Sequence, residues 1–235
     1  MKLWPRKPTI VERRKGVGGV ELRVTRRDGK YRLDTAKVNY SFGALHDVFV
    51  EAFESAGVDE LRPQSALVLG MGAGSVVELL NRRYPPQRIV AVELDPVVVE
   101  LARRHFAIER HANLTIANEC AARFLQSRAE TFDLTVVDVF VENLVPEVCE
   151  TDEFLADLRR VTRRMTLFNR MTDTPDNRRR NERFARQFVR CFPEHQRLVL
   201  PDNNVWIGFA KHPPSPNPPS QTGAPTVRPQ IERRT

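Results

Sequence analysis

The chain has 235 residues, 29% of them charged, and a formal net charge of +7. Its length suits one α/β domain with a buried sheet and is too short for two such domains with tails. It contains no apolar run long enough for a membrane span or a signal peptide, and its three widely spaced cysteines argue against structural zinc and a disulfide framework, so we expect a cytoplasmic protein.

Charge is unevenly distributed along the chain. Residues 1–40 carry twelve Lys or Arg and four acids, a second basic region runs from Arg159 to Arg190, and residues 138–158 contain seven acids and no base. A basic face most often marks a solvated surface, so nucleic acid is the less favoured partner, although the sequence does not exclude it.

The two ends of the chain differ in composition from its middle. Residues 1–18 are basic and contain proline, and residues 212–235 are rich in Pro, Ser and Thr. Neither segment has enough apolar surface to offset the entropy of folding, so we expect a flexible N-terminus and a disordered tail.

Residues 19–64 form the first structured region. Two alternating apolar segments flank Asp28-Gly29, a pair typical of a two-residue β-hairpin turn. Apolar residues at helical spacing then predict a helix over 41–56. We expect a small N-terminal β-hairpin extension followed by this helix.

Residues 65–211 alternate short apolar runs with amphipathic stretches. We predict strands at 66–70, 88–93, 114–117, 134–140, 165–169, 195–200 and 205–211, and helices at 74–83, 96–106, 120–128, 152–163 and 176–190. Strands that are apolar throughout and alternate with helices indicate a doubly wound, mostly parallel sheet of seven strands, covered by helices on both faces.

A glycine-rich turn follows the first buried strand of this domain. Gly70, Gly72 and Gly74 form G-x-G-x-G and open a helix. Glycines there let the backbone pass close to a nucleoside and leave helix N-terminal N–H groups facing it. The spacing lacks the last glycine of the dinucleotide fingerprint, which disfavours a nicotinamide cofactor.

Two acids follow at the end of the next strand. Glu93 lies nineteen residues after Gly74, where a carboxylate can accept hydrogen bonds from both ribose hydroxyls. Asp95 precedes Pro96 and is equally suited to cap the next helix or to contact the nucleoside.

Three segments together carry a family resemblance. LVLGMGAGSVVELL, VAVELDPVVVELARRHF and the ARFL and FDLTVVDVF pair resemble the central domain of spermidine synthases over roughly residues 16–211. The resemblance implies the Rossmann-like fold of class I methyltransferases. It also implies decarboxylated S-adenosylmethionine, or S-adenosylmethionine itself, as a co-substrate, without a metal, and transfer of an aminopropyl group to an amine.

The resemblance also assigns site residues. Asp138 matches the catalytic aspartate, and a carboxylate there can take the proton that an attacking amine must lose. His46 and Asp47 match a His-Glu pair near the acceptor. Glu119, Cys120 and Pro146 fall in the donor pocket, with Cys120 in place of the Asp that contacts adenine and Glu119 as its substitute.

The chain departs from the family mainly on the acceptor side. Leu45, Ala73 and Val141 stand where the family has a Tyr and two Asp that contact the amine. Desolvating a diamine without opposing carboxylates costs several kcal/mol. Glu142, in the acid-only segment, is a candidate replacement anchor; a solvated loop is the equally weighted alternative.

Three functions stay open at this point. The first is aminopropyl transfer with Asp138 as base, the second is S-adenosylmethionine-dependent methyl transfer, and the third is nucleoside binding by an inactive regulatory protein. The fold alone does not choose among them. The resemblance also implies association through the N-terminal β-region, so a homodimer is expected.

Overall fold

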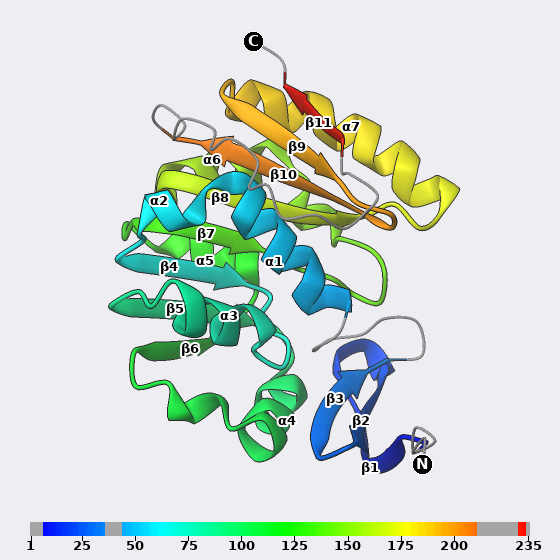
Figure 1. Cartoon of the computed structure of the whole chain (residues 1–235). Coiled ribbons are helices and arrows are strands. Elements are labelled where there is room, and N and C mark those ends of the chain that lie inside the picture. Colours follow the sequence, from blue (N-terminus) through cyan, green and yellow to red (C-terminus); the bar gives the residue numbers. More distant parts are fainter. Residues whose placement is uncertain (1–6, 36–43, 211–229, 234–235) are drawn as a thin grey trace, which may run out of the picture.

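The computed structural model describes residues 7–35, 44–210 and 230–233, which form two sheets and their helices (Figure 1). The strands are β1 Thr9–Lys15, β2 Glu21–Arg27, β3 Lys30–Asp34, β4 Ser65–Leu69, β5 Arg88–Glu93, β6 Leu114–Asn118, β7 Phe132–Val137, β8 Thr162–Met171, β9 His195–Val199, β10 Asn203–Phe209 and β11 Gln230–Arg233. The helices are α1 Ala44–Ala56, α2 Val58–Leu61, α3 Ser75–Arg83, α4 Pro96–Phe106, α5 Ala121–Ser127, α6 Asp152–Val161 and α7 Pro175–Cys191, with short 3-10 turns at Val17–Gly19, Ile108–Arg110 and Glu147–Cys149.

The small N-terminal sheet is antiparallel, in the order β1-β2-β3. Strands β2 and β3 form the predicted hairpin, and its turn places Asp28 at φ 49° and Gly29 at φ 79°. The expectation that all of residues 1–18 are flexible was wrong, because Thr9–Lys15 pairs with β2. Backbone hydrogen bonds stabilise this strand, although its side chains alternate only weakly in polarity.

The large sheet has the order β11-β9-β10-β8-β7-β4-β5-β6. The five strands from β8 to β6 are parallel, and β10 and β9 are antiparallel to their neighbours, which gives the predicted seven-stranded, mostly parallel sheet. Strand β11 adds an eighth strand along β9. Residues 230–233 of the segment expected to be disordered are therefore paired, and residues 211–229 lie outside the described part.

Helices cover both faces of the large sheet, as Figure 1 shows. One apolar cluster joins α1, α2 and α3 to one face, and a second joins α5, α6 and α7 to the other. Strands β4 and β7 are buried at every position, so their side chains pack against helices on both sides. This explains why these strands are apolar throughout instead of alternating.

The parallel strands bring their carboxyl ends to one edge of the sheet. Strand β4 lies between β5 and β7 in the sheet, so the strand order reverses at β4. Such a reversal opens a crevice at the carboxyl edge of the sheet. The described residues contain no helix that is long and apolar enough to cross a bilayer.

Candidate active site

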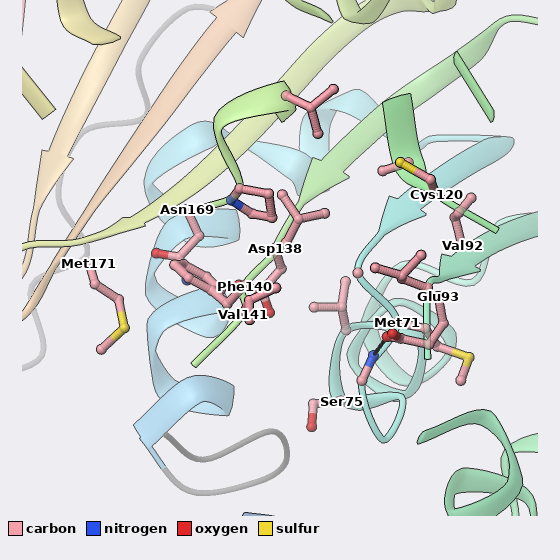
Figure 2. A pocket seen from close by; sticks show the side chains of 18 of the residues that line it. Met71, Ser75, Val92, Glu93, Cys120, Asp138, Phe140, Val141, Asn169 and Met171 are labelled. Carbon is pink, nitrogen blue, oxygen red and sulfur yellow. Dashed lines mark hydrogen bonds between the residues drawn. The ribbon is translucent and has the colours of Figure 1, made fainter. Parts of the chain in front are cut away.

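A cavity of about 300 Å³ opens at this crevice. That volume lies at the lower end of the range for small-molecule sites. Its wall is formed by residues at or just after the carboxyl ends of β4, β5, β6 and β7, by residues near the end of β8, by Val48 of α1, and by the connection between β9 and β10 with the first residue of β10. Figure 2 shows Glu93 and Asp138 facing this space from neighbouring parts of the wall.

The glycine turn between β4 and α3 forms the floor of the cavity. Gly70, Gly72 and Gly74 all have positive φ, at 86°, 54° and 92°. A Cβ on Gly70 would lie 2.3 Å from the carbonyl oxygen of Asp138, and one on Gly74 would lie 2.2 Å from Ile108 Cδ1. At Gly70, glycine is therefore required both by backbone conformation and by the close approach of the backbone that follows β7. At Gly74, the backbone conformation favours glycine, and an added Cβ would meet the end of the Ile108 side chain.

Glu93 lies at the end of β5, and its side chain is buried. Its Oε2 accepts a hydrogen bond from the Gly72 N–H at 2.9 Å, and its Oε1 accepts one from the Asp95 N–H at 3.0 Å. Burial raises the pKa of Glu93, while these backbone donors oppose the rise. The Leu94 N–H is a third backbone donor that lowers this pKa. A carboxylate has about four acceptor sites, so Glu93 can still accept a hydrogen bond from a ribose hydroxyl.

Asp95 takes the structural role of the two that its position suggested. Its Oδ1 accepts a hydrogen bond from the Val97 N–H at 2.8 Å and caps α4, and its Oδ2 accepts one from the Val17 N–H at 2.7 Å. Asp95 is absent from the cavity wall, unlike its neighbours Glu93 and Leu94. A direct contact between Asp95 and a nucleoside therefore has no support in this geometry.

Asp138 follows β7 directly and is held by an amide network. Asn169 Nδ2 donates to Asp138 Oδ1 at 2.9 Å, and Asn203 Nδ2 donates to Asn169 Oδ1 at 2.9 Å. The second bond fixes the orientation of the Asn169 amide, so that its N–H group points at Asp138. No hydrogen bond within the described part of the chain involves Asp138 Oδ2.

The surroundings of Asp138 change its proton affinity. Burial raises the pKa of Asp138 to about 7, the hydrogen bond from Asn169 opposes this rise, and the negative charge of Glu93 adds to it. A carboxylate with such a pKa exchanges protons near neutral pH, as a general base requires.

The predicted adenine side of the cavity is mostly apolar. Glu119, Cys120 and Pro146 all line it, together with Ala121 and Val139. Cys120 is a partly exposed free thiol at the N-cap of α5 and makes no capping hydrogen bond through its side chain. Flat apolar walls with one carboxylate at the edge suit a purine ring and its amino group.

The residues predicted to contact the acceptor amine are placed differently from the residues of the donor side. Asp47, in the first turn of α1, is exposed and does not line the cavity, whereas Val48 does. The side chain of His46 lies outside the described residues. Glu142 has a left-handed backbone at φ 54° and is also absent from the cavity wall; its role as a replacement anchor stays a prediction.

Part of the acid-only segment is used in ion pairs. Glu150 is 5% exposed and accepts hydrogen bonds from the buried Arg170 and from Arg180, the latter at 2.6 Å. Asp152 pairs with Arg190 at 3.0 Å on the surface. These acids neutralise arginines of β8 and α7 instead of facing the cavity as a group.

The polar side chains of Asn169, Asp202 and Asn203 line the cavity and were missed by sequence reasoning. Asn169 is 1% exposed and lies within β8, and a polar side chain in a buried strand was the available signal. Asp202 lies in the turn before β10 and Asn203 is the first residue of β10, in a region that the sequence predicted only as a connection between two strands. Their place in the cavity follows from β10 pairing with β8, since Asn203 lies opposite Met171.

The described residues contain no group of three His, Cys, Asp or Glu side chains that could hold a metal ion. The charged groups on the cavity wall are instead carboxylates from separate elements, namely Glu93, Glu119, Asp138 and Asp202. A predominantly negative wall favours a cationic ligand, and a sulfonium is one such group.

Comparisons with known proteins agree with this geometry. A family model for a methyltransferase domain matches residues 66–165. A polyamine aminopropyltransferase of Vibrio vulnificus is 29% identical over 103 residues, which cover 43% of this chain and 34% of that protein. An eEF1A lysine and N-terminal methyltransferase homolog of Drosophila melanogaster is 26% identical over 137 residues, or 54% of this chain and 20% of that protein.

A solved structure extends the likeness to most of the fold. The crystal structure of a probable spermidine synthase from Corynebacterium glutamicum superposes with a TM-score of 0.74 at 17% identity, covering 86% of this chain and 81% of that one. The aligned parts span about a third or less of the length of the two sequence relatives. The chain is thus similar in sequence to polyamine aminopropyltransferases and to methyltransferases, and it has the Rossmann-like methyltransferase fold.

Proposed function

We propose that this protein is an aminopropyltransferase that uses decarboxylated S-adenosylmethionine and a small amine. The observation that carries the proposal is that Glu93 and Asp138 line one cavity beside the glycine turn. Glu93 would hold the ribose, the apolar wall near Ala121 and Val139 would hold the adenine, and the positive sulfonium would lie near both carboxylates. The similarity to aminopropyltransferases supports the same donor.

The amine loses a proton before it attacks. Asp138, whose pKa is raised to about 7, accepts that proton, since an ammonium has no lone pair with which to react. The amine nitrogen then forms a bond to the aminopropyl carbon while the bond between this carbon and sulfur breaks. The electron pair stays on sulfur, and the neutral product is methylthioadenosine.

The protein contributes mainly position to this displacement. Asn169 and Asn203 hold Asp138 in one orientation, and the cavity aligns the nitrogen, the carbon and the sulfur. Fixing two reactants in line can supply about 7 kcal/mol or more of the barrier reduction, and neither a metal nor a covalent intermediate is required.

Asp202 is our candidate for the acceptor side. It lies on the same cavity wall as Asp138, next to Asn203, and its carboxylate is exposed at the rim. Val48, Val141 and Met171 supply apolar surface in the same cavity. An acceptor with an alkyl chain and a second positive charge would use both features.

The test is to identify the nucleoside that is released. Purified protein is incubated with decarboxylated or ordinary S-adenosylmethionine and a panel of mono-, di- and polyamines, and the products are separated by chromatography. We expect methylthioadenosine from the decarboxylated donor, and release that is at least about a hundredfold slower from the Asp138→Asn variant. Absence of methylthioadenosine with every amine would exclude aminopropyl transfer.

Methyl transfer is the second candidate. The methyltransferase-domain match and the apolar side chain of Val141, in place of an acidic anchor, favour it. Release of S-adenosylhomocysteine from ordinary S-adenosylmethionine would identify it. Binding of the donor without turnover, unchanged in Asp138→Asn, would instead indicate a nucleoside-binding regulatory protein.

A further inference from the structure

The N-terminal sheet packs against the donor side of the large domain, beside α4 in Figure 1. Leu22, Val24 and Leu33 of this sheet share one buried apolar cluster with Ala73 of the glycine turn and with residues of α4. Ala73 is 2% exposed. The small sheet therefore covers the glycine turn on the side away from the cavity.

Polar contacts fix the same sheet along α4. Arg14 donates two hydrogen bonds to the Glu100 carboxylate, at 3.1 Å and 2.9 Å. Glu12 contacts His105 Nε2 at 2.7 Å and accepts a hydrogen bond from Arg104 at 2.8 Å. These contacts set the position of the turn between β1 and β2.

That turn reaches the start of α4. The Val17 N–H donates to Asp95 Oδ2 at 2.7 Å, and the Asp95 N–H in turn donates to Glu93 Oε1 at 3.0 Å. Asp95 and these two hydrogen bonds thus connect the N-terminal sheet to the carboxylate of Glu93, which faces the cavity.

Gly16 brings the turn close enough for this contact. Its φ of −89° and ψ of −167° are accessible to any residue, so glycine is not needed for its conformation. A Cβ at this position would lie 2.0 Å from Asp95 Oδ2 and 3.0 Å from Leu22 Cδ1. Glycine is therefore required here for space against Asp95.

We propose that Gly16 and Asp95 are positioning residues for the donor nucleoside, through which the N-terminal sheet acts on the donor site without lining it. Asp95 does not touch the ligand in this proposal. It transmits the position of the β1–β2 turn to Glu93. The inference rests on the proposed function only in taking Glu93 as the group that binds the ribose.

The first test is Gly16→Ala, with binding of S-adenosylmethionine measured by isothermal titration calorimetry. We expect Kd to rise about tenfold, because the methyl group displaces Asp95 and with it the backbone N–H that donates a hydrogen bond to Glu93. With a turnover assay, KM for the donor should rise and kcat should change less than threefold. Thermal unfolding of the free protein shows whether the variant is folded.

Gly18→Ala is the matched control. Gly18 lies in the same turn with φ 69°, and a Cβ there would have no atom within 4 Å. The substitution strains the turn without approaching Asp95, so Kd should stay within twofold of the wild type. An equal loss of affinity in both variants would show that general weakening of the turn is responsible, and would overturn the proposal.

Asp95→Ser is the second variant. A serine hydroxyl can still cap α4 but is too short to accept the Val17 N–H as well. We expect a similar loss of affinity, and a less than additive effect when it is combined with Gly16→Ala. A wild type that binds no adenosyl compound would contradict the proposed function and this inference together. Binding that Gly16→Ala and Asp95→Ser leave unchanged would contradict this inference alone.

Discussion

At the scale of single residues, the site depends on two acids with raised pKa values. Asp138 and Glu93 lie on one cavity, and the charge of Glu93 contributes to the raised pKa of Asp138. A cationic donor placed between them would stabilise both ionised forms. Donor binding and ionisation of the base are therefore expected to favour each other.

Asp138→Asn should reduce turnover by about 10²- to 10⁴-fold, the usual contribution of a general base. The amide keeps the size of the side chain, so Kd for the donor should change less than threefold. Release of methylthioadenosine and calorimetric titration of the donor measure the two effects. A variant that retains more than half of the wild-type rate would exclude Asp138 as the base.

The same residue should make stability depend on pH. Asp138 holds its proton up to about pH 7 in the folded protein, whereas an unfolded chain releases it near pH 4. Between these values the folded state binds more protons, so the free energy of unfolding contributed by Asp138 falls as pH rises. The free energy of unfolding that Asp138 loses between about pH 4 and pH 7 is at most about 4 kcal/mol, because the cavity admits solvent.

Urea denaturation at pH 5 and pH 8 checks this expectation. Asp138→Asn removes the titrating group, so the difference between the two pH values should be smaller in the variant than in the wild type. At pH 8 the variant should be the more stable protein, since it buries no charge. Equal pH dependence in both proteins would contradict the assignment of a raised pKa to this carboxyl.

At the scale of elements, the loop between β7 and α6 is held by a buried ion pair. Glu150 pairs with Arg170 of β8 and with Arg180 of α7, and both Glu150 and Arg170 are at most 5% exposed. Arg170 also stacks on Phe184, with 4.1 Å between the guanidinium carbon and the ring centroid. The pair fixes a loop that contributes Pro146 and Val148 to the cavity wall.

Glu150→Gln should lower the free energy of unfolding by about 3 kcal/mol, because it leaves the buried Arg170 without a countercharge. Asp152→Asn is its control, since Asp152 and Arg190 are both about 60% exposed and such a pair contributes about 0–1 kcal/mol. Equilibrium urea denaturation measures both. Similar small losses in the two variants would show that the Glu150 pair does not stabilise the loop.

The turn between β9 and β10 gives a prediction about the acceptor. Asp202→Asn should raise KM for a diamine about two- to fivefold, the effect of one exposed ion pair, with little change for a monoamine. Added salt should reduce the difference between wild type and variant. Glu147→Gln serves as the control, because Glu147 is exposed and does not line the cavity.

At the scale of the whole molecule, the N-terminal sheet and the large domain share a core. Leu33 is fully buried in the cluster that includes Val98 and Leu101 of α4. The apolar face of the small sheet is buried against α4, and burial of such a face is what stabilises a small sheet. The two sheets are therefore expected to unfold together.

Leu33→Ala should cost about 2–5 kcal/mol, as for other buried leucines, whereas Ile10→Ala, at a side chain that is 43% exposed, should cost less than about 0.5 kcal/mol. Unfolding is followed by circular dichroism and by fluorescence of Trp206 in a Trp4→Phe background. Coincident transitions are expected in both variants. Separate transitions would mean that the N-terminal sheet is an independent unit.

The sequence alone was enough to predict the α/β class, the hairpin at Asp28-Gly29 and the order of strands and helices from 65 to 209. These features depend on local periodicity and on turn residues, which adjacent side chains specify. It also placed the glycine turn, Glu93 and Asp138 at strand ends, because the carboxyl ends of parallel strands share one edge of the sheet.

Which polar groups meet at that edge depends on tertiary contacts. β1 and β11 were missed because pairing with a partner strand, and not their own composition, orders them. Pairing of β10 with β8 places Asp202 and Asn203 beside the end of the strand that carries Asn169, whereas Glu142 is absent from the cavity wall. Such contacts join residues far apart in the chain, so their geometry depends on packing that no local pattern encodes.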